Sequence, residues 1–255
     1  MDIIVRVDEL LHLEETFCLS TVVTSDQPHI PIAHKTIILA DGSMEGALGL
    51  EQFDSKLYSY AYDALKDNKS GIVQVELGVE VFFNVMSAEK QLLICGAGHI
   101  AVPLAQYALM AGFRVTVLDD RSDFAHPARF AGCKVVAEDF REALHSMPLD
   151  ASSYVVVITR GHEHDFDCLL EILHKDTAYV GMIGSRRRVG FVLDMLNREG
   201  LSLERLADVF TPIGIPIGAE SPEEIAISII SELVCVRRKG PAQARALRNA
   251  AGIDK

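Results

Sequence analysis

The chain has 255 residues, of which 49% are hydrophobic and 24% are charged, and its formal net charge is −12. This length is enough to bury a sizeable core, and it is typical of one to two globular domains. The negative charge argues against nucleic-acid binding, and no apolar run approaches the about 20 residues of a membrane-spanning helix. An acidic N-terminal stretch without signal-peptide features and five scattered cysteines predict a cytoplasmic protein with reduced thiols.

Short alternating elements predict a small α+β domain over residues 1–88. A hairpin signal, Asp41-Gly42, follows a β-branched run and predicts that a further strand pairs with that run. In chain order we expect a helix at 7–15, strands at 19–24 and 35–40, a helix at 50–68, and strands at 72–77 and 79–85. Residues 86–90 are polar and are predicted to link this domain to the next.

From residue 89 to 240 the pattern changes to continuous apolar strands alternating with helices. This pattern predicts an α/β fold in which a Rossmann-type parallel sheet carries helices on both faces. The expected strands are 92–95, 115–119, 134–137, 154–159 and 178–184, and the expected helices are 100–111, 141–146, one after His162, 186–198 and one from 225. Residues 241–255 are basic and alanine-rich, and this C-terminal tail is expected to be either a loose helix or frayed.

The strongest local motif follows the first of these strands. It reads Gly96-x-Gly98-x-x-Ala101, in which missing side chains let the backbone turn tightly and approach a pyrophosphate at a helix start. We therefore expect Gly96, Gly98, His99 and Ile100 to contact a phosphate-bearing cofactor. The competing interpretation is a Rossmann turn that has lost its ligand.

An acidic residue is expected at the end of the second strand, about 20 residues after the turn, to hold a ribose hydroxyl. Asp119 occupies this position, followed by Asp120 and Arg121. Since an arginine there accommodates a 2′-phosphate, the segment leaves NAD and NADP both open.

A second polar segment, Thr159-Arg160-Gly161-His162, stands at the end of the fourth strand, where open α/β sheets bind their ligands. Arg160 is suited to bind a phosphate or carboxylate, and His162 to relay a proton. The competing interpretation is helix capping by Asp165 beside solvated histidines. The spacing of the histidines disfavours a metal site, and we predict none.

Two further segments carry candidate ligand-binding residues. Gly184-Ser185-Arg186 places a helix N-cap and an arginine after the fifth strand, which together predict an anion site. Glu220 follows a glycine-proline loop and is a second candidate. Ser221 and Glu224 behind it are explained by a capping box at the start of a helix.

Taken together, the motifs CGAGHIA, VTVLDDR, FAHPARF, ITRGHEHD, YVGMIGSRRR and PIGIPIGAESPEEIAISIISELV resemble the XdhC/CoxI family of xanthine dehydrogenase accessory proteins. The resemblance spans roughly residues 92–238. It implies a two-domain maturation factor that binds the molybdenum cofactor and helps a cysteine desulfurase exchange an oxo ligand for sulfide. It further implies that the factor inserts the cofactor into a molybdenum hydroxylase client, so that the protein is more a chaperone than a catalyst.

The first domain departs from the family pattern. Leu48 or Gly49 stands where family members carry a cysteine, and neither residue supplies a soft thiolate ligand. Two other functions stay open at this stage. One is an NAD(P)-dependent oxidoreductase, for which no catalytic tyrosine-lysine pair is found, and the other is a nucleotide-binding scaffold. Homodimerisation is expected because Rossmann proteins commonly pair.

Overall fold

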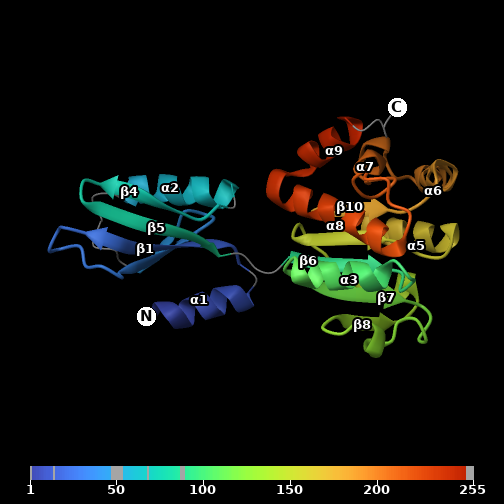
Figure 1. Cartoon of the computed structure of the whole chain (residues 1–255), viewed down its shortest axis with the longest axis horizontal. Coiled ribbons are helices and arrows are strands. Elements are labelled where there is room, and N and C mark those ends of the chain that lie inside the picture. Colours follow the sequence, from blue (N-terminus) through green and yellow to red (C-terminus); the bar gives the residue numbers. More distant parts are fainter. Residues whose placement is uncertain (1, 14, 47–53, 68, 87–89, 251–255) are drawn as a thin grey trace. The chain divides into compact units, whose positions relative to one another are not determined.

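The computed structural model describes residues 2–13, 15–46, 54–67, 69–86 and 90–250. The chain divides into two compact units, Met1–Glu89 and Lys90–Lys255, each with its own core (Figure 1). Among the described residues, no helix combines the length and the apolar character needed to cross a membrane.

The first unit is an antiparallel sheet with one helix on each face. The strand order is β3-β2-β1-β5-β4. Its elements are α1 (Ile3–His12), β1 (Phe17–Ser25), β2 (Lys35–Leu39), β3 (Met44–Gly46), α2 (Asp54–Asp67), β4 (Gly71–Glu76) and β5 (Val79–Met86). Side chains alternate between the faces of a strand, so Phe17 packs with Leu10 of α1, whereas Cys18 packs with Leu57 of α2.

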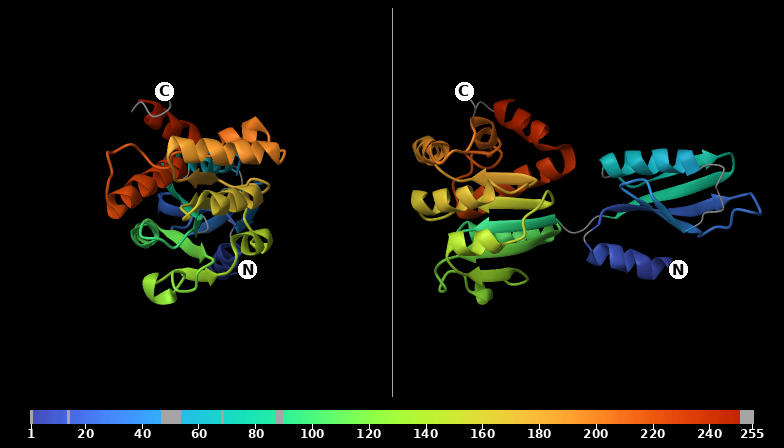
Figure 2. Two further views of the ribbon diagram at one scale, coloured as in Figure 1. Left: turned by 90° about the vertical axis from the view of Figure 1, so that its right-hand side faces the viewer. Right: turned by 180° about the vertical axis from the view of Figure 1, so that it is seen from behind.

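The second unit is a parallel five-stranded sheet, which confirms the Rossmann-type α/β fold predicted from the sequence. Its elements are β6 (Lys90–Cys95), α3 (Ala101–Met110), β7 (Phe113–Asp119), η2 (Pro127–Arg129), β8 (Lys134–Ala137), α4 (Phe140–Ser146), β9 (Ser153–Val157), α5 (His162–Ile172), β10 (Tyr179–Met182), α6 (Arg186–Arg198), α7 (Leu203–Ala207), α8 (Pro222–Lys239) and α9 (Pro241–Ala250). Helices α3 and α8 cover one face, and α4, α5 and α6 cover the other (Figure 2).

The strand order of this sheet, β10-β9-β6-β7-β8, determines where a ligand can bind. The chain enters at the central strand β6, runs outward to β7 and β8, and then crosses back to β9 on the other side of β6. At this reversal the connections after β6 and β9 leave in opposite directions and open a crevice at the carboxyl ends of the two strands. The glycine turn and the Thr159-to-His162 segment both lie at this crevice.

The C-terminal segment forms a helix over residues 241–250, as one of the two expected alternatives had it, but the helix packs into the second unit and is not loose. Ala244 and Arg248 of α9 are buried, with Arg248 only 2% exposed. The Arg248 guanidinium donates to the Glu232 carboxylate of α8 at 3.3 Å and to the Thr211 carbonyl at 2.8 Å. Glu232 also accepts hydrogen bonds from the Tyr179 hydroxyl and, at 3.0 Å, from the Gly214 amide. A buried ion pair therefore fixes the helix, which hydrophobic periodicity alone did not indicate.

Candidate functional site

The two glycines of the β6–α3 turn differ in how much space their surroundings leave for a side chain. Gly96 has a φ of +112°, and a Cβ there would lie 2.5 Å from the Ile158 carbonyl oxygen, so the packing of the turn against the end of β9 requires glycine. A Cβ on Gly98 would meet no atom within 4 Å. The packing of the fold therefore does not explain glycine at 98, which stays a candidate for the close approach of a phosphate.

Two helices begin at this crevice without a side-chain cap. Helix α3 follows Ile100, which makes no capping hydrogen bond, and its first turn contains no acidic residue; α5 likewise begins after Gly161 without a side-chain cap. By contrast, α1, α4, α6, α7 and α8 are each capped by an aspartate or serine. Unsatisfied N–H groups and the helix dipole suit the start of α3 to an anion, whereas the first turn of α5 carries the carboxylates of Glu163 and Asp165, which oppose one there.

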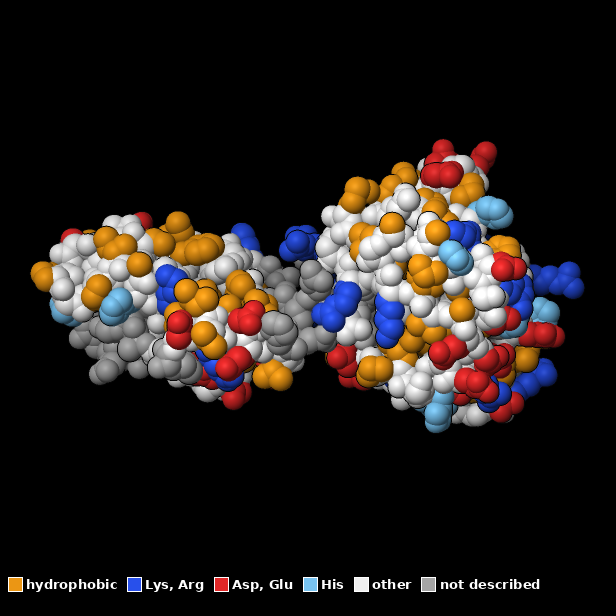
Figure 3. All heavy atoms as spheres, turned by 90° about the horizontal axis from the view of Figure 1, so that it is seen from below, with side chains coloured by type: hydrophobic (Ala, Val, Ile, Leu, Met, Phe, Trp, Pro, Cys, Tyr) orange, Lys and Arg blue, Asp and Glu red, His pale blue; other side chains and the backbone are white. Residues whose placement is uncertain are grey.

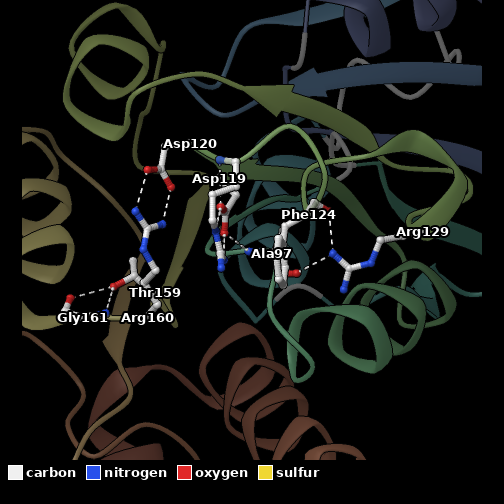
Figure 4. A network of polar contacts seen from close by, with 9 residues as sticks. Ala97, Asp119, Asp120, Phe124, Arg129, Thr159, Arg160 and Gly161 are labelled. Carbon is white, nitrogen blue, oxygen red and sulfur yellow. Dashed lines mark hydrogen bonds and ion pairs between the residues drawn. The ribbon is translucent and has the colours of Figure 1, made fainter.

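The backbone N–H and the backbone carbonyl of Ala97, inside the turn, are each held by a side chain (Figure 4). Its N–H donates to the Asp119 carboxylate at 2.7 Å, and its carbonyl accepts from the Arg129 guanidinium at 2.8 Å. Arg129, on η2, also donates to the Phe124 carbonyl at 2.6 Å. Sequence reasoning did not single out Arg129. The available signal was its place in the FAHPARF motif, in the connection that follows Asp119.

The carboxylate of Asp119, expected to contact a ribose hydroxyl, is engaged by the protein itself. It is 1% exposed, and besides the Ala97 amide its carboxylate accepts from the Arg121 amide and guanidinium at 2.8 to 3.1 Å. Burial alone raises the pKa of this carboxyl, but the bonds from Arg121 and Ala97 lower it overall. These four bonds fill the acceptor positions of a carboxylate. Asp119 thus positions the turn, and Arg121 lies over the Phe124 ring at 3.7 Å.

Arg160, expected to bind a ligand anion, is paired with Asp120. Its two terminal nitrogens lie 2.5 and 2.7 Å from the two carboxylate oxygens. The hydrogen bonds from Arg160 lower the pKa of Asp120 to about 2. Asp120 follows β7 and Arg160 follows β9, so the pair passes across the end of β6.

Asp165 does not cap α5, contrary to one interpretation of its segment. It is fully buried and accepts hydrogen bonds of 2.6 Å from the Thr159 hydroxyl and from the Arg188 guanidinium. Arg188 also donates to the Thr159 carbonyl at 3.1 Å. Burial raises the pKa of Asp165 despite this pairing. Arg188 therefore joins α6 to the Thr159 loop, while Arg186, the predicted anion-binding residue, is exposed and stays a prediction.

The remaining candidates are distributed over two places. His162 and Ser185 line a pocket of about 430 Å³ between the starts of α5 and α6. Ser185 caps α6 through the Arg188 amide, as predicted. Gly184 precedes it with an extended backbone whose φ is +158°. Glu220 is exposed, and its amide donates to Glu224 within the predicted capping box, so the structure does not bring it to the pocket.

The histidines of this region are separated. The His162 ring meets Phe191 at a centroid distance of 5.2 Å, whereas His164 meets Phe140 at 5.4 Å. Within the described part of the chain, no group of three or more His, Cys, Asp or Glu is arranged to hold a metal ion. Figure 3 shows acidic, basic and histidine side chains crowded together at the right-hand end of the second unit, the end toward which its strands run.

A parallel sheet of this strand order, with a glycine turn and two helix starts without side-chain caps at its reversal point, defines a Rossmann-type domain. The family model described as the XdhC Rossmann domain matches residues 92–233, more than half of the chain, and the chain belongs to this family. A model of pyridine nucleotide-disulphide oxidoreductases also matches, over residues 4–145, a range that crosses the boundary between the two units.

Individual proteins agree with this assignment. The chain is 27% identical over 91% of its length to an uncharacterized Escherichia coli protein, YqeB, and covers 46% of that protein. It is 29% identical over 62% of its length to a probable xanthine dehydrogenase subunit of Bacillus subtilis, again covering 46%. The chain thus spans about half the length of these curated relatives. A crystal structure of a xanthine dehydrogenase from Bacillus halodurans shares the fold, with a TM-score of 0.70 at 21% identity, over 94% of this chain and 69% of that one.

Proposed function

We propose that this protein is an accessory factor for a molybdenum hydroxylase of the xanthine dehydrogenase type. In this role its second unit binds the molybdenum cofactor at the start of α3 and assists sulfuration and insertion of the cofactor. Membership of the XdhC family and the name of the Bacillus subtilis relative support the association with such an enzyme. A molybdenum hydroxylase client, a cysteine desulfurase and a second copy of the chain are the proposed partners.

The open space at Gly98 is the observation that carries the proposal. This position suits a phosphate, because no atom lies within 4 Å of where a Cβ of Gly98 would stand and the uncapped start of α3 offers N–H donors. The amides of Gly98, His99 and Ile100 would hold the cofactor phosphate, with Arg160 as a second contact. When bound, the cofactor supplies the molybdenum oxo ligand that sulfuration replaces, while the residues of this chain bind and orient the phosphate.

Leu48 and Gly49, which stand where related proteins carry a cysteine, lie outside the described residues. Among the described cysteines, Cys18, Cys95 and Cys168 are buried, and Cys133 and Cys235 are half-buried. Burial raises the pKa of Cys18 to about 11 and that of Cys168 well above its usual range. Buried thiols of high pKa are poor nucleophiles, so in this proposal sulfur transfer depends on the partner desulfurase.

A dinucleotide such as NAD(P) is the second candidate ligand, because the oxidoreductase family model matches part of the chain. The same glycine turn suits a pyrophosphate. The described thiols do not offer the exposed, low-pKa pair that disulfide exchange uses. A nucleotide-binding scaffold without chemistry is the third candidate.

Thermal unfolding of the purified protein with molybdenum cofactor, NAD, NADP and AMP in parallel distinguishes these functions. A ligand that binds only the folded state stabilises it by roughly 2.7 kcal/mol at a hundredfold excess over its dissociation constant. The proposal predicts a rise with molybdenum cofactor that is lost in Arg160→Ala and retained in Arg198→Ala, an exposed arginine at the far end of α6. A rise with NAD or NADP alone would overturn it in favour of a nicotinamide-dependent protein. A rise with AMP alone would favour the nucleotide-binding scaffold, and no rise with any of them would overturn the proposed phosphate site.

A further inference from the structure

The pocket between α5 and α6 lies beside the crevice at Gly98, on the side of β9 and β10. His162, Ser185, Arg187, Arg188 and Phe191 line it, and its volume of about 430 Å³ is sufficient for a ring system. Because β9 and β10 are parallel neighbours, both helix starts that form the pocket lie at the same carboxyl edge as the glycine turn. His162 follows Gly161 directly, so one end of the pocket adjoins the reversal point.

The side chains that line the pocket differ in whether another residue of the protein already binds them. Arg188 is fixed by Asp165 and Thr159 and forms a rigid cationic wall. Arg187 is exposed and makes no hydrogen bond or ion pair with any residue that the structure describes. Phe191 is 51% exposed and contacts the His162 ring edge-on. A guanidinium without a partner among the described residues, beside a half-exposed aromatic ring, suits a flat ring that carries an anionic or carbonyl oxygen.

At the end of β7, on the opposite side of the crevice, the carboxylates of Asp119 and Asp120 are both engaged by other residues of the protein. The four acceptor positions of Asp119 are filled by Ala97 and Arg121, and Asp120 is engaged by Arg160. In a Rossmann domain, a carboxylate at this position usually accepts a hydrogen bond from the ribose of the ligand. Here that carboxylate binds the protein's own backbone and Arg121 instead.

We infer that the pocket of His162, Ser185, Arg187, Arg188 and Phe191 is the specificity site of this domain and binds a flat, oxygen-bearing ring of a ligand whose phosphate lies at Gly98. The inference rests on the proposed phosphate site. It adds a second site, at which the protein binds the organic part of the same ligand. The ring stacks on Phe191 and takes its polar contact from Arg187, while Arg188 and His162 shape the walls.

Isothermal titration calorimetry on the full chain tests this with three probes: inorganic pyrophosphate, which has no ring, and FAD and NAD, which have one at each end. We expect FAD or NAD to bind about tenfold more tightly than pyrophosphate, the usual scale of one aromatic stacking contact. Phe191→Ala and Arg187→Ala should each remove most of this advantage while leaving pyrophosphate binding unchanged. Phe191→Tyr should retain it, and Arg198→Ala on the same helix is the charge-matched control.

The inference is overturned if neither FAD nor NAD binds more tightly than pyrophosphate, or if their advantage survives both Phe191→Ala and Arg187→Ala. Failure of the underlying phosphate site gives a different result, since pyrophosphate itself would then not bind. Because Phe191 and Arg187 are exposed, these variants should fold, and an unchanged thermal midpoint verifies this.

Discussion

Arg160 and Asp120 form a two-pronged ion pair across the carboxyl end of β6, with nitrogen–oxygen distances of 2.5 and 2.7 Å. The same planar donors of a guanidinium fit a phosphate equally well. In the proposed site, Asp120 occupies the donors of Arg160 that a ligand phosphate would use, so that the two anions would compete for one arginine.

This competition predicts opposite effects for the two partners. Asp120→Asn should release Arg160 and raise the affinity for pyrophosphate by about two- to fivefold, the scale of a partly exposed ion pair. Arg160→Ala should lower it by about 10- to 100-fold, because hydrogen bonds to charged groups contribute roughly 1.5–3 kcal/mol. Calorimetric titration measures both. If both variants weaken pyrophosphate binding to the same extent, Asp120 supports binding together with Arg160 and does not compete with the phosphate for it.

The depressed pKa of Asp120 predicts a pH dependence of stability. The pKa is about 2 in the folded protein and 3.8 ordinarily, so the ion pair stabilises the fold above about pH 4 and this stabilisation is lost as the pH falls toward 2. Because Arg160 is 41% exposed, solvent screening limits the effect to about 1 kcal/mol. In urea unfolding between pH 2 and 6, the free energy of unfolding of the Asp120→Asn protein should lie below that of the wild type at pH 6 and approach it as the pH falls to 2. A difference between the two proteins that does not change with pH would contradict the assignment of a depressed pKa to Asp120.

The two glycines of the turn should respond differently to alanine. Gly98→Ala adds a methyl group in open space and should change the free energy of unfolding by less than about 0.5 kcal/mol while weakening phosphate binding. Gly96→Ala places a methyl group against the Ile158 carbonyl at an unfavourable φ and should destabilise by about 2–4 kcal/mol. Denaturant unfolding and pyrophosphate titration measure the two effects. Unimpaired binding by the Gly98→Ala protein would remove the main support for the phosphate site.

Helix α9 should be essential to the stability of the second unit. Arg248→Met leaves the buried Glu232 carboxylate without its cationic partner and should cost about 3–5 kcal/mol. In the double variant Glu232→Gln/Arg248→Met no unpaired charge is buried, and the Gln carbonyl can still accept from Tyr179 and Gly214. The double variant should therefore be more stable than Arg248→Met alone. Equal stability would mean that packing, rather than charge, holds the helix.

Local patterns predicted much of the fold. Continuous apolar strands alternating with helices indicated the parallel sheet, because this periodicity is a property of neighbouring residues. Hairpin and capping signals at Asp41-Gly42, Ser185 and Ser221 were equally local, and the structure has a hairpin or a cap at each of them. The position of the glycine turn at the carboxyl end of β6 followed from the same alternation.

Pairings between distant segments could not be predicted in this way. Asp119 was assigned to a ligand because its spacing from Gly98 fits that role, but spacing does not reveal that Arg121 and Ala97 fill its acceptors. The choice of Arg188 over Arg186 depends on which side of α6 faces Asp165, and a run of three arginines does not show this. The burial of Arg248 likewise depends on Glu232, 16 residues away on another helix.

The clamp on the Ala97 peptide affects how fast a ligand can bind. Because Asp119 and Arg129 fix that peptide on both sides, the turn acquires its shape during folding and has little backbone entropy left to lose on binding. Association with a phosphate should accordingly be a single-step encounter whose rate does not saturate with ligand concentration. In Arg129→Ala, where one side of the clamp is gone, a slower, saturating ordering step should follow the encounter.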